Sequence, residues 1–97
     1  MMITVKIHTI LEIKKIIGQR EIEISLPRGS TLNTLLARLI DTWGETLKTQ
    51  LFDPNTSELF THIRLMVNGR DIGFLNKLET ILSNGDEILI LPPVGGG

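Results

Sequence analysis

The C-terminus holds the residues of this chain that are best suited to chemistry. Gly95, Gly96 and Gly97 end the sequence, after Pro92, Pro93 and Val94. Proline fixes φ and glycine leaves it free, so this order gives a stiff spacer followed by a slim, rotatable tip. Because the last three residues have no Cβ atom, a partner can close a narrow channel around them and reach the terminal carbonyl carbon. We therefore expect chemistry at the Gly97 carboxylate; the alternative is a disordered glycine tail without a role.

A C-terminal carboxylate cannot react unaided, because it is ionised at neutral pH and is a poor electrophile. The sequence has no phosphate-binding glycine loop, no recognisable pair of catalytic carboxylates and no Ser/His/Asp arrangement with supporting context. The terminal glycines precede no helix and so do not form a nucleotide loop. His8 and His62 fit strand surfaces better than catalytic positions. Nothing in the sequence looks like a self-sufficient active site, so we expect a partner enzyme to supply the activation.

Composition narrows the class of protein. A chain of 97 residues forms one domain, and its 10 basic and 11 acidic residues almost cancel, with no strongly basic stretch. Nucleic acid and anionic membranes are therefore poor candidates for partners. No cysteine and only two histidines are present, so we expect neither a disulfide framework nor a metal site. The N-terminus lacks a leader-like pattern and no long apolar run occurs, which indicates a soluble, cytoplasmic protein.

Alternating apolar residues predict a strand over residues 3–9 and a second over residues 20–26, paired as an antiparallel hairpin. Residues 11–17 are ambiguous and fit a short helical turn better than a strand. A long helix follows, with Ser30 or Thr31 as its N-cap and Gly44 as its end. Its apolar stripe consists of Leu32, Leu35, Leu36, Leu39, Ile40 and Trp43. Residues 45–60 could hold a second short helix and otherwise form a surface connection to which we assign no function.

The C-terminal part predicts three further strands. Residues 63–67 form one strand, Asn68 and Gly69 make a hairpin turn, and residues 70–72 return. Residues 87–91 form the last strand, which is apolar on both sides and therefore belongs in the centre of the sheet. The fold class is α+β, with a mixed sheet of about five strands crossed by one long helix. Residues 1–91 form the domain and residues 92–97 a flexible tail. If the far face of the last strand is exposed, it forms a docking site beside the tail, together with Phe74, Pro92 and Val94.

Several motifs taken together resemble the MoaD family, the small sulfur-carrying subunit of molybdopterin synthase in the ubiquitin-like β-grasp group. The similarity covers nearly the whole chain, and only the combination of motifs is specific. It includes the first hairpin and residues 26–32, which lead into the helix. The C-terminal motifs are Asn68-Gly69-Arg70, Phe74-Leu75, Leu78, Leu82, Asn84-Gly85-Asp86-Glu87, Pro92-Pro93-Val94 and Gly96-Gly97.

This resemblance implies a β-grasp fold and a specific chemistry. An E1-like enzyme would adenylate Gly97 with ATP and Mg, and the end would then become a thiocarboxylate. The sulfur would pass to a pterin precursor in the large subunit of molybdopterin synthase, into which the tail is inserted. Gly96 and Gly97 would form the reactive end, and no cofactor would be bound stably. The expected partner-binding residues are Phe74, Leu91, Pro92, Pro93, Val94 and Gly95.

The chain departs from the family pattern in two places. Residues 45–60 look longer than in short members, which leaves other functions open. Gly95 stands where a small non-glycine residue is usual, which hardly affects the chemistry. One alternative is a ubiquitin-like protein modifier, or a sulfur carrier for thiamine thiazole synthesis or tRNA thiolation. Another is a non-catalytic β-grasp interaction module whose tail is inert.

Overall fold

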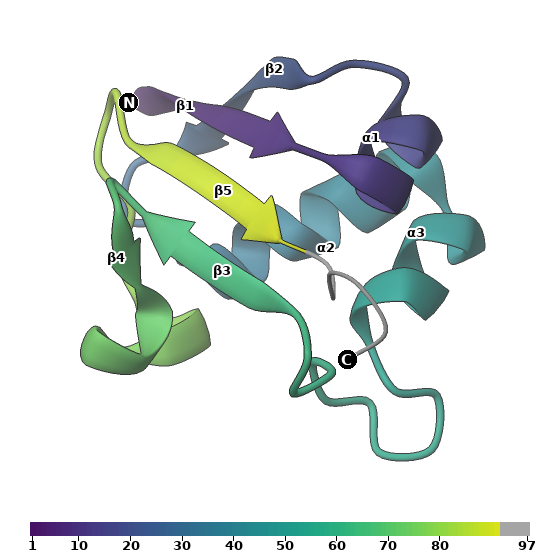
Figure 1. Cartoon of the computed structure of the whole chain (residues 1–97). Coiled ribbons are helices and arrows are strands. Elements are labelled where there is room, and N and C mark those ends of the chain that lie inside the picture. The colour runs from purple at the N-terminus through teal and green to yellow at the C-terminus, as the bar shows by residue number, and fades with distance from the viewer. Residues whose placement is uncertain (92–97) are drawn as a thin grey trace.

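A single mixed sheet of five strands organises the molecule (Figure 1). The computed structural model describes residues 1–91, so predictions about residues 92–97 lie outside the described residues. The strand order is β2-β1-β5-β3-β4. The strands are β1 (Met2–Thr9), β2 (Glu21–Pro27), β3 (Arg64–Val67), β4 (Arg70–Asp71) and β5 (Glu87–Leu91).

The last strand is central, as its two-sided apolar composition predicted. It pairs in parallel with β1, where Thr9 lies beside Ile90, and antiparallel with β3, where Arg64 lies beside Leu91. Strands β1 and β2 form the predicted antiparallel hairpin. The chain thus reaches its C-terminal segment from a strand that is hydrogen-bonded on both sides.

The predicted long helix is α2 (Leu32–Trp43), which lies behind the sheet in Figure 1. Of the two candidate N-caps, Thr31 is the one used: its hydroxyl accepts a hydrogen bond from the Thr34 N–H at 3.3 Å. Gly44, at φ 73° and ψ −158°, ends the helix in a conformation that side-chain-bearing residues avoid.

Two shorter helices accompany α2, so the sheet is not covered by one helix alone. The ambiguous residues 11–17 form α1 (Leu11–Ile17), and residues 45–51 form α3 (Glu45–Leu51). Each is fixed by two buried apolar side chains, Ile13 and Ile17 in α1 and Leu47 and Leu51 in α3. Two single turns of 3-10 helix, η1 (Ile72–Phe74) and η2 (Lys77–Glu79), carry the chain from β4 toward β5.

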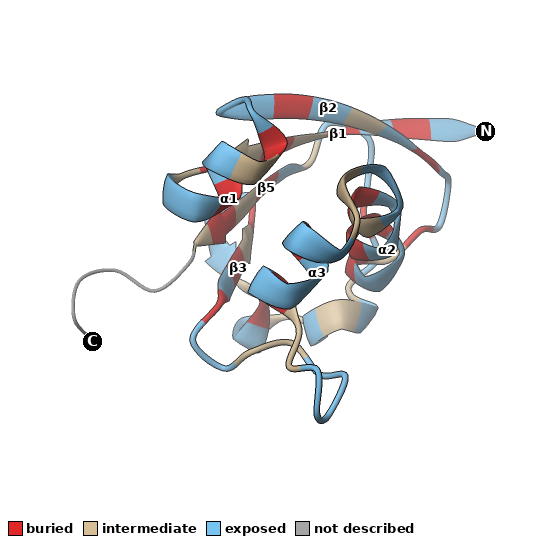
Figure 2. Ribbon diagram, turned by 90° about the vertical axis from the view of Figure 1, so that its right-hand side faces the viewer, coloured by how far each residue is buried: buried red, intermediate tan, exposed pale blue. Residues whose placement is uncertain are grey.

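The core lies between one face of the sheet and the helices, as the buried segments in Figure 2 show. Strands β1, β3 and β5 each alternate between buried and less buried residues, so their buried side chains share this face. The fully buried large side chains are Ile7, Ile13, Leu26, Leu32, Leu35, Leu36, Leu39, Leu47, Leu51, Leu65, Ile88 and Ile90. Within residues 1–91, none of the helices is long and apolar enough to span a bilayer.

Candidate functional site at the end of the central strand

The candidate site begins at Leu91, the last residue of β5 and the last that the structure describes. Because β5 is parallel to β1 and antiparallel to β3, it ends where β1 ends and β3 begins. Hydrogen bonding on both sides fixes the position of β5 up to Leu91. The other predicted tail residues lie outside the described residues: Pro92, Pro93, Val94, Gly95, Gly96 and Gly97.

A short apolar strip leads along the open face of the sheet to this point. It consists of Met66, Leu89 and Leu91, which we call the tail-root strip. Met66 lies beside Leu89 in the β3·β5 register, and all three side chains are half-buried. Helices α2 and α3 lie on the opposite face of the sheet (Figure 1). The predicted apolar surface on the far face of β5 is therefore present and open.

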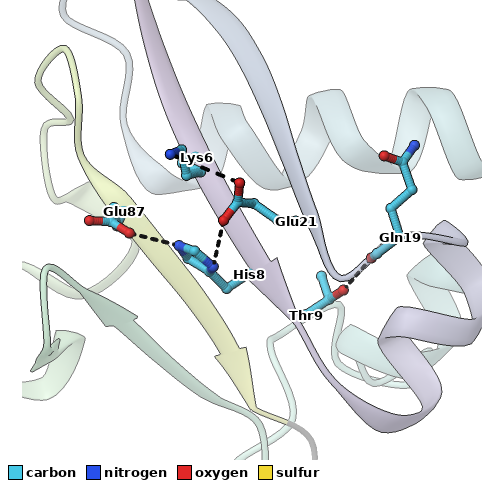
Figure 3. A network of polar contacts seen from close by, with 6 residues as sticks. All are labelled: Lys6, His8, Thr9, Gln19, Glu21 and Glu87. Carbon is cyan, nitrogen blue, oxygen red and sulfur yellow. Dashed lines mark hydrogen bonds and ion pairs between the residues drawn. The ribbon is translucent and has the colours of Figure 1, made fainter.

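Charged groups border the strip on the β1 side (Figure 3). The His8 ring contacts two carboxylates: its Nε2 lies 2.8 Å from Glu87 Oε1, and its Nδ1 lies 3.5 Å from Glu21 Oε1. Lys6 Nζ lies 3.9 Å from Glu21 Oε2. These contacts join β2, β1 and β5 across the open face. His8 is thus a surface strand residue, as predicted, and it links three strands.

An ion pair borders the strip on the β3 side, where Arg64 Nε lies 3.2 Å from Asp71 Oδ2. The strip is therefore a narrow apolar band between two polar margins. Such a band suits a contact that orients a partner by its charges while burying apolar area at the centre.

The polar groups of the open face do not converge on a metal. The two ring nitrogens of His8 face different carboxylates, so His8, Glu21 and Glu87 do not point at one common position. Among residues 1–91, no cluster of three or more His, Cys, Asp or Glu side chains is arranged to hold an ion.

The Asn-Gly and Asn-Gly-Asp-Glu motifs tie two turns together at the start of β5. Asn68 donates from Nδ2 to Asp86 Oδ1 and accepts at Oδ1 from the Glu87 N–H, each at 2.9 Å. Asp86 Oδ2 accepts from the Ser83 N–H at 2.8 Å. We call these residues, Asn68, Ser83, Asp86 and Glu87, the turn lock. They serve architecture: they hold β5 in register between its neighbours.

A residue missed by sequence reasoning stands near the same end of the sheet. Leu11 follows the end of β1, is 50% exposed and has φ 53°. A leucine in the left-handed region is strained, and such strain gathers at functional positions. No sequence signal marks it, because leucine at the start of a helix is ordinary. Leu11 and Leu91 both lie where β1 and β5 end.

Phe74 is exposed over 87% of its surface, consistent with a side chain available to a partner. It belongs to η1, which follows β4 at the edge of the sheet. Strand β3 lies between β4 and β5 (Figure 1). The sheet therefore does not bring Phe74 next to Leu91. The structure therefore separates Phe74 from the tail-root strip, whereas the sequence grouped them.

The segment after α2 also forms a cavity of about 340 Å³ between α2, α3 and the following loop. Its walls carry apolar groups such as Ile40 and Phe52 and charges of both signs from Lys48 and Asp53. No convergent set of polar groups marks a substrate position, and we assign this cavity no chemistry.

Comparisons with known proteins place the chain in a family. A family model described as "ThiS family" matches residues 10–97. A putative sulfur carrier protein of Archaeoglobus fulgidus is 37% identical over 81 residues, which cover 84% of this chain and 89% of that protein. The sulfur carrier protein CysO of Mycobacterium tuberculosis is 33% identical over 98 residues and is covered completely, as is this chain.

A solved structure supports the same assignment. The solution structure of small archaeal modifier protein 1 from Methanosarcina acetivorans is 30% identical, with a TM-score of 0.81, over 100% of this chain and 99% of that one. The fold is therefore the ubiquitin-like β-grasp that the motifs implied. By its sequence and its fold, the chain belongs to the ThiS family, among ubiquitin-like proteins of the MoaD and ThiS type.

Proposed function

We propose that this protein is a sulfur carrier and that the Gly97 carboxylate is its reacting group. One observation carries the proposal. The central strand, held on both sides, ends at Leu91, and six residues ending in three glycines follow it. The similar proteins of A. fulgidus and M. tuberculosis are named sulfur carriers, which supports the same role here.

The chemistry requires activation by a partner. We propose that an E1-like enzyme joins the Gly97 carboxylate to AMP, using ATP with Mg and releasing pyrophosphate. A sulfur nucleophile then attacks the carbonyl carbon, and AMP leaves with the original carboxylate oxygen, so that a thiocarboxylate remains. Gly96 and Gly97 suit both steps because neither has a side chain to block the approach.

The tail-root strip is the proposed docking surface for these partners. Residues 92–97 can extend at most about 20 Å from Leu91, so a partner that reaches Gly97 must bind close to the end of β5. The half-buried Met66, Leu89 and Leu91 offer apolar area there. Within the tail, Pro92, Pro93, Val94 and Gly95 would guide the end into a channel. Phe74 would make a separate contact beyond β4.

For the acceptor, we propose a pterin precursor bound by the large subunit of molybdopterin synthase, with both proteins in the cytoplasm. The support is the resemblance to the MoaD family, which combines Asn84-Gly85-Asp86-Glu87, Pro92-Pro93-Val94 and the terminal glycines. A second candidate is transfer of Gly97 to lysines of other proteins. The 30% identity to small archaeal modifier protein 1 supports that candidate. A carrier for another acceptor, in thiamine or tRNA thiolation, is a third.

A truncation separates the carriers from an inert interaction module. Deleting Gly96 and Gly97 should leave the fold unchanged. It should abolish acceptance of AMP and sulfur, because the terminal carboxylate then belongs to Gly95 and lies two residues closer to the domain. A matched variant with extra residues after Gly97 should behave the same way. A truncated protein that still accepted AMP or sulfur, or full function in the extended variant, would overturn the proposal. Conjugates of Gly97 to lysines in lysates would instead favour the modifier.

A further inference from the structure

The outer edge of the sheet at β2 is open over most of the strand. Strand β2 pairs with β1 only and ends the strand order on that side. The opposite edge, β4, is short: two residues against seven in β2. A long edge strand with unpaired main-chain groups is a template for pairing with another extended segment.

Hydrogen bonding shows which main-chain groups of β2 face outward. The Thr9 N–H donates to the Arg20 C=O at 2.9 Å, and the Arg28 N–H donates to the Met1 C=O at 2.8 Å. Bonded pairs alternate with non-bonded pairs in an antiparallel ladder, so the even-numbered residues of β2 bond to β1. The N–H and C=O groups of Glu21, Glu23 and Ser25 therefore point away from β1. Within residues 1–91, β2 pairs with no strand other than β1, and no loop or turn bonds to these groups.

The edge closes at its C-terminal end. Pro27 has no N–H, and its C=O accepts from the Ser30 N–H at 3.1 Å and from the Ser30 hydroxyl at 2.6 Å. The available stretch is therefore residues 21–25. A partner strand of about five residues would fill it.

Side chains give this edge two different faces. An open hollow along this edge is lined by both acidic and apolar side chains, namely Gln19, Glu21, Ile22, Glu23, Ile24 and Trp43. Ile24 and Trp43 are half-buried, so apolar surface is available there. On the open face, Glu21 and Glu23 are both exposed. Because side chains of a paired strand alternate between the faces, the two faces together specify a pattern of alternating residues.

The charge is only partly balanced within the chain. Glu21 lies near Lys6 and His8 (Figure 3). Glu23 lies opposite Lys6 in the β1·β2 register, but the Lys6 ammonium lies near Glu21, and Glu23 forms no ion pair with any residue among 1–91. A cationic residue on the outer side of Glu23, in an added strand, would make a cross-strand pair of opposite charge, which stabilises paired strands.

A second copy of this chain fits the edge poorly. Two β2 strands paired antiparallel about Glu23 would place Glu23 directly against Glu23, and like charges opposite each other are destabilising. Pairing about Ser25 would place Pro27, which has no N–H, opposite Glu23. Pairing about Ile24 would place Glu23 opposite Ser25 and Glu21 opposite Pro27, and pairing about Ile22 would place Glu21 opposite Glu23. In none of these four registers does a second copy place a cation opposite Glu23.

We propose that the β2 edge binds an extended peptide segment of a partner protein by strand addition, the segment alternating basic residues with apolar ones. The basic residues lie opposite Glu21 and Glu23, and the apolar residues meet Ile24 and Trp43. Strand β1 separates β2 from β5, so a bound segment leaves the end of β5 accessible. The edge can therefore hold one partner while the tail engages another.

The test is a titration of the full-length protein with a capped seven-residue peptide in which lysine and valine alternate, followed by NMR. We expect a dissociation constant of about 1 mM or tighter. The amide signals of Glu21, Glu23 and Ser25 should shift, and their hydrogen exchange should slow. Glu23→Lys should weaken binding by about fivefold to tenfold. Glu58→Lys, the same charge reversal at an exposed position between α3 and β3, should leave binding unchanged.

Two controls separate strand addition from charge attraction. A peptide N-methylated at alternate residues keeps its charges but cannot pair, and it should not bind. A glutamate-valine peptide should bind Glu23→Lys better than the original protein. The proposal is overturned if no β2 amide shifts, if the shifts fall on Met66 and Leu89, or if the N-methylated peptide binds equally well. Shifts that grow with protein concentration alone would show a second copy at this edge instead.

Discussion

Substitution of Asn68 tests whether the turn lock is architectural. Asn68 has φ 52° and makes two side-chain hydrogen bonds, to Asp86 and to the Glu87 N–H. Each bond contributes about 0.5–1.5 kcal/mol, and the lower half of that range applies because both are exposed. Asn68→Gly keeps the left-handed backbone at no steric cost, so we expect it to lower the free energy of unfolding by about 1–2 kcal/mol.

Asn68→Ala loses the same two hydrogen bonds and adds a methyl group at positive φ. The left-handed region costs a side-chain-bearing residue about 1–2 kcal/mol, so the total loss should be about 2–4 kcal/mol. A domain of this size has about 5–15 kcal/mol of stability, and both variants should remain folded at 25 °C. The melting temperature should fall by about 4–8 °C for each kcal/mol lost.

Urea unfolding followed by fluorescence measures both variants, because Trp43 is the single tryptophan and is half-buried. The order of stability should be original, then Asn68→Gly, then Asn68→Ala. Activation of Gly97 per folded molecule should be the same in all three. If Asn68→Gly lowers the free energy of unfolding as much as Asn68→Ala does, the left-handed backbone at residue 68 is not a source of strain. If neither changes stability by more than about 0.5 kcal/mol, yet activation stops, the motif acts in chemistry and not in architecture.

Two further pairs of variants separate the faces of β5 and the strain near its end. Ile90→Ala removes a fully buried side chain and should cost about 2–5 kcal/mol in urea unfolding. Leu89→Ala, on the half-buried tail-root strip, should lower the free energy of unfolding by less, but it should raise the KM of the activating enzyme for this protein. If the KM is the same for the variant and the original protein, the strip is not a docking surface. Leu11→Gly should be more stable than Leu11→Ala by about 1 kcal/mol, because both lose the exposed side chain but only alanine keeps the positive-φ strain. Equal melting temperatures for these two variants would contradict that strain.

Periodicity was enough to predict the sheet and its main helix. The alternation in residues 3–9, the stripe of α2 and the two-sided apolar character of β5 each have one simple packing solution, and the structure adopts it. Short segments were harder. Residues 11–17 carry too few turns for their period to decide between helix and strand, and their buried Ile13 and Ile17 settled it through tertiary contacts.

The candidate site was only partly predictable, because its geometry depends on register. Sequence placed Leu91 at the end of the last strand correctly, since that depends on chain order alone. The grouping of Phe74 with Leu91 needed the position of β4, which local pattern does not specify. The contacts of His8 with Glu21 and Glu87 likewise arise from pairing between strands far apart in sequence. The positive φ of Leu11 could not be predicted either, because leucine is not a residue type that marks left-handed backbone.

The most direct test of the account is the intact mass of the protein after incubation with an E1-like enzyme, ATP and a sulfur donor. The account predicts the mass gain of one oxygen replaced by sulfur, located at Gly97 by fragmentation and absent from the protein lacking Gly96 and Gly97. An unchanged mass with an enzyme that activates another carrier of this family in the same mixture would contradict it. So would a sulfur gain that persists in the truncated protein.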